Sequence, residues 1–149
     1  MTENKATVGR PPVLILNAYG PFLRRPLSEA LHRAGFEAMP ALGLENAVEI
    51  ARSRKLAGVV VGLNLRQGTS GEVLESGLSL FARFLAEVGD PGFATRPIVV
   101  TVTHRSSSGV VDEEAARHGI ANPRLLASKA DVLDPAFAGA MREHFALGW

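Results

Sequence analysis

Apolar and polar residues alternate along the chain in blocks that predict strands and helices in turn. Short continuous apolar runs bounded by turn formers are typical of strands buried on both faces of a sheet. Between these runs, apolar residues recur three and four positions apart, which predicts amphipathic helices. The predicted strands are 13–16, 36–41, 57–61, 97–103 and 124–127, and the predicted helices are 24–34, 44–54, 71–88, 111–118 and 134–146.

Capping and turn residues define the predicted ends of several helices. Gly35 stands where a C′ glycine ends a helix, and Ser70 is expected to be the N-cap of the third helix. Asp134 and Pro135 are expected to occupy the N-cap and N1 positions of the last helix. Pro26 is expected in the first turn of its helix, because a proline further inside removes a hydrogen bond.

Strand and helix alternate five times, which predicts a parallel sheet covered by helices on both faces. We therefore expect a three-layer α/β/α fold of the doubly wound, flavodoxin-like (βα)5 type, with strand order 2-1-3-4-5. The chain has 149 residues, which fits one domain. We place that domain at residues 13–149, after a disordered lead-in at residues 1–12.

Composition excludes several classes of function. The chain has no cysteine, so disulfides and thiolate chemistry are excluded. Its four histidines have no metal-ligand spacing. The formal net charge of +1 favours neither nucleic acid nor an anionic membrane, and no apolar run is long enough to span a bilayer. We expect a cytoplasmic protein.

Three stretches carry a resemblance to a known family. Residues 34–38 with 45–51 are similar to a second strand and second helix that often read Gly-Phe-Glu-Val and Glu-Glu-Ala-Leu-Glu-Leu-Ala. Residues 62–65 are similar to an Asp-Leu-Asn-Leu-Pro sequence after a third strand, and residues 128–130 to a Thr-Lys-Pro sequence after a fifth. Together they resemble the receiver (CheY-like) domain of bacterial two-component response regulators, over about residues 12–145.

The resemblance implies a phosphorylation site at the carboxyl edge of the sheet. The family uses two acidic residues for Mg²⁺, an aspartate as phosphoacceptor, a Thr or Ser, and a Lys. Here the acidic pair falls on Asn17 and Ala18, the phosphoacceptor on Gly62 and the hydroxyl on Val102, while Lys129 is kept.

No carboxylate stands close enough in sequence to replace the missing ones. Residues 17–25 and 62–71 contain no Asp or Glu, and asparagine side chains offer Mg²⁺ only neutral oxygens. We predict a degenerate phosphorylation pocket with no metal, no cofactor and no catalytic residue. Its members are Asn17, Ala18, Gly62, Asn64, Val102, Thr103 and Lys129.

These observations favour a pseudo-receiver that is not an enzyme and acts as a protein–protein interaction module in a bacterial two-component-like pathway. The resemblance implies contact with a signalling protein or a second copy of the chain through the helix 4–strand 5–helix 5 face, about residues 111–147. The alternative is a flavodoxin-like domain that binds a small molecule or anion near Lys129. The identity of the partner, the oligomeric state and the role of Trp149 stay open.

Overall fold

Five parallel strands form the central sheet of the computed structural model, which describes residues 10–16, 20–63, 66–67, 69–70, 73–102 and 108–146. The order of the strands is β2-β1-β3-β6-β7, which confirms the predicted order 2-1-3-4-5. The strands are β1 (Pro12–Leu16), β2 (Glu37–Pro40), β3 (Gly58–Gly62), β6 (Ile98–Val102) and β7 (Arg124–Ser128).

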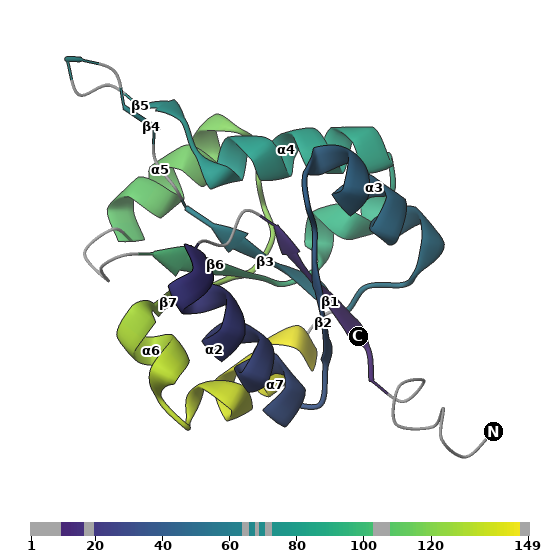
Figure 1. Cartoon of the computed structure of the whole chain (residues 1–149). Helices are drawn as coiled ribbons and strands as arrows, with labels where there is room; N and C mark the ends of the chain where they lie inside the picture. Colours follow the sequence, from purple (N-terminus) through teal and green to yellow (C-terminus); the bar gives the residue numbers. More distant parts are fainter. Residues whose placement is uncertain are drawn as a thin grey trace.

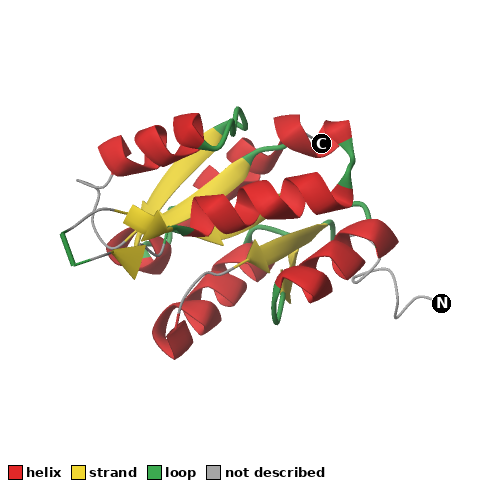
Figure 2. Ribbon diagram, turned by 90° about the horizontal axis from the view of Figure 1, so that it is seen from above, coloured by secondary structure: helices red, strands yellow, loops and turns green. Residues whose placement is uncertain are grey.

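Helices cover both faces of the sheet, as the alternation predicts (Figure 1). One face carries α3 (Leu44–Ser53), α4 (Gly77–Val88) and α5 (Ser108–Arg117). The other face carries α2 (Gly20–Arg33), α6 (Lys129–Leu133) and α7 (Phe137–Ala146). Seen from above, the helices run alongside the twisted strands (Figure 2). A short 3-10 helix, η2 (Pro91–Thr95), precedes β6.

Side chains of the strands divide between two cores according to the two-residue period of a strand. In β1, Leu14 and Leu16 pack under α3, α4 and α5, whereas Val13 and Ile15 pack under α2, α6 and α7. The same division holds in β3 and β6, where every residue is buried. Burial on both faces is the reason that these strands read as continuous apolar runs in the sequence.

The second predicted element begins earlier than expected. Helix α2 begins at Gly20, so Pro26 lies inside the helix and the prediction that it occupies the first turn is wrong. Pro21 takes the first-turn position, where a missing N–H costs nothing. At the other end, Gly35 has a φ of 94°, and the N–H of Phe36 donates to the carbonyl of Leu31 at 2.9 Å. This Schellman motif confirms Gly35 as the C′ residue.

The third helix begins at Gly77, six residues later than predicted, and Ser76 rather than Ser70 is its N-cap. Part of the segment predicted as helix instead forms a two-stranded antiparallel hairpin of β4 (Arg66–Gln67) and β5 (Val73–Glu75). The hairpin projects from the body of the domain at the upper left of Figure 1. Apolar residues at 73 and 74 fit both a helical stripe and a strand, which is why the pattern misplaced the helix start.

The last predicted helix is two helices. Ser128 caps the five-residue helix α6, and α7 begins only at Phe137. Asp134 is the C-cap of α6, and its side chain accepts the N–H of Ala136 at 2.9 Å. The prediction that Asp134 and Pro135 start a single helix is therefore wrong, because the Asp-Pro pair forms the turn between two helices.

Helix α5 begins at Ser108, three residues before the predicted start at position 111. Residues 1–9 and Trp149 lie outside the described residues, so the disordered lead-in and the domain boundary stay predictions. Throughout the described segments, no helix has the length and apolar character needed to cross a bilayer.

His144 joins α7 to the sheet. Its Nε2–H donates to the carbonyl of Ile98 at 2.7 Å, at the first residue of β6. Burial lowers the pKa of His144 below its usual value, and the carbonyls of Ile98 and Pro123 oppose this effect only in part. The ring is therefore neutral at pH 7 and acts as a hydrogen-bond donor between helix and strand.

Candidate functional site

The carboxyl ends of β3, β6 and β7 lie side by side and bring together the described members of the predicted pocket. Gly62 pairs with Thr101, and Val102 pairs with Ser128. Lys129 follows directly as the first residue of α6. Asn17, Ala18, Asn64 and Thr103 lie outside the described residues. The edge at which open α/β sheets place their ligands is thus built here from Gly62, Val102 and Lys129.

Helix α4 packs directly on the backbone of Gly62, the residue that the sequence resemblance assigns to the phosphoacceptor position. The N–H of Gly77 donates to the carbonyl of Leu63 at 2.6 Å, and the N–H of Leu63 donates to the carbonyl of Thr101 at 2.9 Å. A Cβ atom on Gly77 would overlap the carbonyl oxygen of Gly62 and stand 2.7 Å from its carbonyl carbon. Only glycine at position 77 permits this approach, so the end of β3 is covered by the first turn of α4.

The described side chains at the end of β6, those of Thr101 and Val102, are both buried. Val102 is buried and packs in the core under α4 and α5. Thr101 is also buried, and its Oγ1 lies 3.5 Å from the carbonyl oxygen of Val61, which is long for an O–H···O hydrogen bond. Neither side chain is placed to hold a phosphoryl oxygen above Gly62.

Lys129 is exposed, and Asp131 follows two residues later in the same short helix. Ser128 and Asp131 form a capping box at the start of α6, in which the N–H of Ser128 donates to Asp131 Oδ2 at 2.9 Å. The N–H of Asp131 in turn donates to Ser128 Oγ at 3.3 Å. A bound anion at this helix start would meet the charge of Asp131, which weighs against the alternative of an anion site near Lys129.

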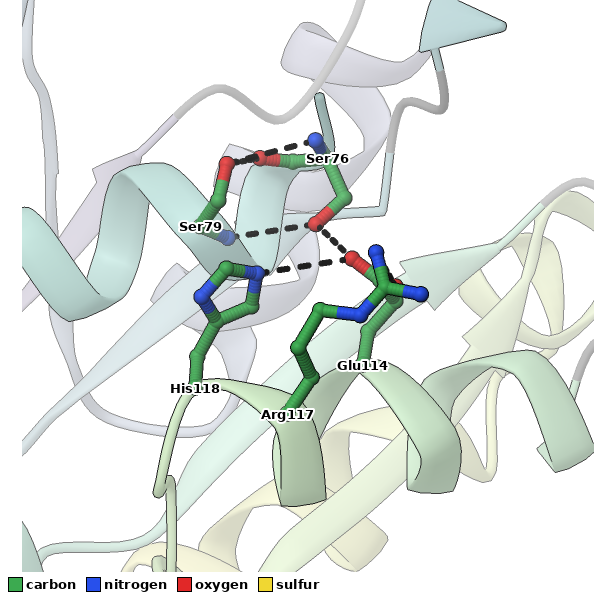
Figure 3. Close-up of polar contacts among 5 residues, drawn as sticks. All are labelled: Ser76, Ser79, Glu114, Arg117 and His118. Atoms are coloured by element: carbon green, nitrogen blue, oxygen red, sulfur yellow. Dashed lines mark hydrogen bonds and ion pairs between the residues drawn. The ribbon is translucent and has the colours of Figure 1, made fainter. Parts of the chain in front are cut away.

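In the described part of the chain, no three His, Asp or Glu side chains are grouped so that they could hold a metal ion. The described residues do contain one buried carboxylate, Glu114 of α5, whose side chain is 3% exposed. Ser76 Oγ donates to Glu114 Oε1 at 2.8 Å. His118 Nε2 lies 3.6 Å from the same oxygen, and Arg117 Nη1 lies 3.3 Å from the other carboxylate oxygen, Oε2 (Figure 3).

Serine, histidine and glutamate together suggest a hydrolase triad, but their order in space is wrong for one. A nucleophilic serine must give its proton to the histidine, and the acid must orient that histidine. Here Glu114 stands between Ser76 and His118, and Ser76 Oγ is buried while it accepts the N–H of Ser79 at 3.1 Å. The group ties the start of α4 to the side of α5.

Sequence reasoning missed this carboxylate, although the signal was present. Glu114 lies three residues after Val111 and directly before Ala115, both of which are buried, so it shares their face of α5. Arg117 and His118 follow at the spacings of three and four that place side chains together on a helix. An acid on an apolar stripe, followed by an arginine and a histidine at those spacings, indicates a buried ion pair.

Comparisons with known proteins give a fold and no closer relative. No protein-family model matches the sequence, and no curated protein matches it. Among solved structures, the chemotaxis protein CheY4 of Vibrio cholerae matches with a TM-score of 0.61 at 15% identity, over 90% of this chain and 97% of that one. A sensor protein from Polaromonas sp. matches with a TM-score of 0.61 at 20% identity, over 94% and 99%.

A third match is the receiver domain of a sensor histidine kinase from Pseudomonas aeruginosa, with a magnesium ion coordinated in its active-site cleft. It has a TM-score of 0.59 at 12% identity, over 92% of this chain and 98% of that one. The chain has the CheY-like receiver fold. The likeness covers nearly the whole chain, which confirms the fold that the resemblance in sequence implied.

Replacing Gly77 by alanine is expected to destabilise the protein. The new methyl group overlaps backbone rather than a movable side chain, so we expect a loss of about 3 kcal/mol, the upper end of the range for overpacking. Gly139→Ala is the matched control, because that helical glycine has open space around it. This variant should raise the free energy of unfolding by about 0.5–1 kcal/mol, since alanine favours a helix more than glycine does. Urea unfolding measures both, and equal effects would contradict the close approach.

Replacing Ser76 by alanine is expected to cost more than replacing Ser128, although both serines cap a helix through a capping box. Each hydroxyl also donates to a carboxylate, Ser76 to the buried Glu114 and Ser128 to the half-buried Asp131 at 3.0 Å, so the difference should be about 1 kcal/mol. The comparison is made by urea unfolding at pH 7. If the two variants lose the same stability, the burial of Glu114 adds nothing to the bond that it accepts from Ser76.

Proposed function

We propose that this chain is a receiver-like signalling module that takes no phosphoryl group, has no catalytic role and acts by contact with another protein. The observation that carries the proposal is the packing of Gly77 on Gly62, the position of the phosphoacceptor. Glycine offers no nucleophile there, and the first turn of α4 covers the backbone. The fold is shared with a chemotaxis protein and with a two-component response regulator, which supports a role in signalling.

In this proposal, permanent contacts between α4 and α5 replace contacts that would form only after phosphorylation. Gly77 seats α4 on the end of β3, and the neighbouring Ser76 bonds to Glu114 of α5. The carboxyl edge of the sheet is therefore connected to α5 without any ligand. A partner that contacts α5 would meet one permanent arrangement of that helix.

The proposed contact surface is the face made by α5, β7 and the helices α6 and α7, which together take the place of helix 5 in the helix 4–strand 5–helix 5 face of the family. β7 is the last strand of the sheet, so one of its edges has no strand beside it in the described segments. Such an edge offers backbone N–H and carbonyl groups to a neighbour. On α5, Asp112, Glu113 and Ala116 are exposed. The partner is either a signalling protein or a second copy of the chain.

Phosphoryl donors are expected to leave the protein unchanged. Incubation with acetyl phosphate and Mg²⁺ should add no mass to the intact chain, and beryllofluoride with Mg²⁺ should not move the amide resonances of Gly62 and Gly77. A receiver domain with its full set of acidic residues serves as the positive control in the same buffer. Stoichiometric formation of an aspartyl phosphate would overturn the proposal.

Charge reversal on α5 tests the contact surface. Glu113→Arg should weaken the association of this face about tenfold, because a reversed charge at the rim of an interface disfavours the complex. Self-association is measured by sedimentation equilibrium. Capture of a signalling protein is quantified by mass spectrometry. Glu49→Arg makes the same change on the exposed side of α3, a helix outside this face, and should have no effect. Equal behaviour of the two variants, or the absence of any association, would contradict this surface.

A further inference from the structure

A cavity lies at the amino edge of the sheet, where β3 and β6 begin, opposite the carboxyl edge described above. It has a volume of about 250 Å³ and is formed by the end of α3, the residues that follow it, and η2. Four cationic side chains and one carboxylate line it, together with an aromatic ring: Arg52, Arg54, Lys55, Arg96, Asp90 and Phe93. No part of the receiver-like site described above enters this cavity.

The lining of the cavity is strongly positive in a chain that is nearly neutral. Four cations less one carboxylate give a formal charge of +3, against +1 for the whole protein. The carboxylate of Asp90 already accepts the N–H of Gly92 at 2.9 Å, as the N-cap of η2. Glu37 pairs with Arg54 at 3.1 Å, so Arg52 and Arg96 are the cations that bear on ligand binding.

Two of the arginines are held in place by neutral groups. The guanidinium of Arg96 lies 4.8 Å from the centre of the Phe93 ring and donates to the carbonyl of Leu56. Arg52 Nη2 donates to the carbonyl of Glu87 at 2.8 Å, in the last turn of α4. Among the described residues, neither guanidinium meets a carboxylate at ion-pair distance. Each of these contacts uses one of five N–H donors, so the charge and most donors remain.

Capping of helix ends explains part of this arrangement. Cations near the last carbonyls of a helix are favourable, and Arg52 fills that role for α4. Arg142 does the same on the other face of the sheet, where it donates to the carbonyls of Arg33 and Ala34 at the end of α2. Capping does not require three arginines around one cavity, nor an arginine stacked on a ring. A planar guanidinium fork fixed by stacking is suited to phosphate oxygens.

We propose that this cavity binds a compact phosphate-bearing anion, such as a diphosphate group. Its volume of about 250 Å³ is below the roughly 300–1,000 Å³ of pockets that hold drug-sized ligands, so a small anion fits and a whole cofactor does not. Beside it, a larger open cavity of about 540 Å³ shares Arg52 but is lined by Glu45, Glu49 and Glu87. These three carboxylates repel a long polyanion that extends into the larger cavity. A small phosphate is therefore a better ligand for this site than nucleic acid. The inference does not depend on the proposed function.

Titration of the full chain with sodium pyrophosphate tests this site by calorimetry and by amide chemical shifts. We expect saturable binding with the largest shifts at residues 51–55 and 93–96. Arg52→Gln should weaken the binding of pyrophosphate at least about tenfold, because it removes one of the guanidinium groups that donate to phosphate oxygens. Arg96→Lys should also weaken binding while keeping the charge, since lysine offers no planar fork.

Arg142→Gln is the matched control, because it also removes an arginine that donates to carbonyls at a helix end. It should lose as much stability as Arg52→Gln and keep full affinity for pyrophosphate. Saturable binding that is lost in the first two variants and kept in the control supports the site. Equal affinity in all variants, a linear response without saturation, or tighter binding of a single-stranded oligonucleotide would each overturn it.

Discussion

The contact between Gly77 and the carbonyl of Gly62 governs the arrangement of the carboxyl edge of the sheet. A backbone-to-backbone approach of this kind tolerates no side chain, so two glycines 15 positions apart in sequence act as one structural unit. It determines where α4 begins and thereby where Ser76 lies. Because Ser76 then reaches Glu114, the position of α5 follows from the same contact.

Glu114 is a costly residue to place in a core, because a carboxylate loses its hydration when it is buried. Ser76 compensates with a hydrogen bond at 2.8 Å, and Arg117 supplies an opposite charge at 3.3 Å. An apolar side chain at position 114 of α5 would pack against α4 in several registers. The carboxylate instead has one satisfied position, which favours a single alignment of α4 and α5.

The two edges of the sheet differ in what they offer to another molecule. At the carboxyl edge, Gly77 packs on the end of β3, and Asp131 accepts the N–H of Ser128 at the start of α6. At the amino edge, arginines are anchored by carbonyls and a ring, and their charge is left for an outside group.

The sequence by itself determined the five strands, their parallel order and the helix end at Gly35, because each depends on local periodicity or on the backbone of one residue. It also determined that Gly62, Val102 and Lys129 meet at one edge, since parallel strands end together. Only the tertiary structure decided that residues 66–75 contain a hairpin and that α4 begins at Gly77. Residues 73 and 74 suit a helix and a strand equally, so the choice depends on whether the following turn can rest on Gly62, a contact that no local pattern contains.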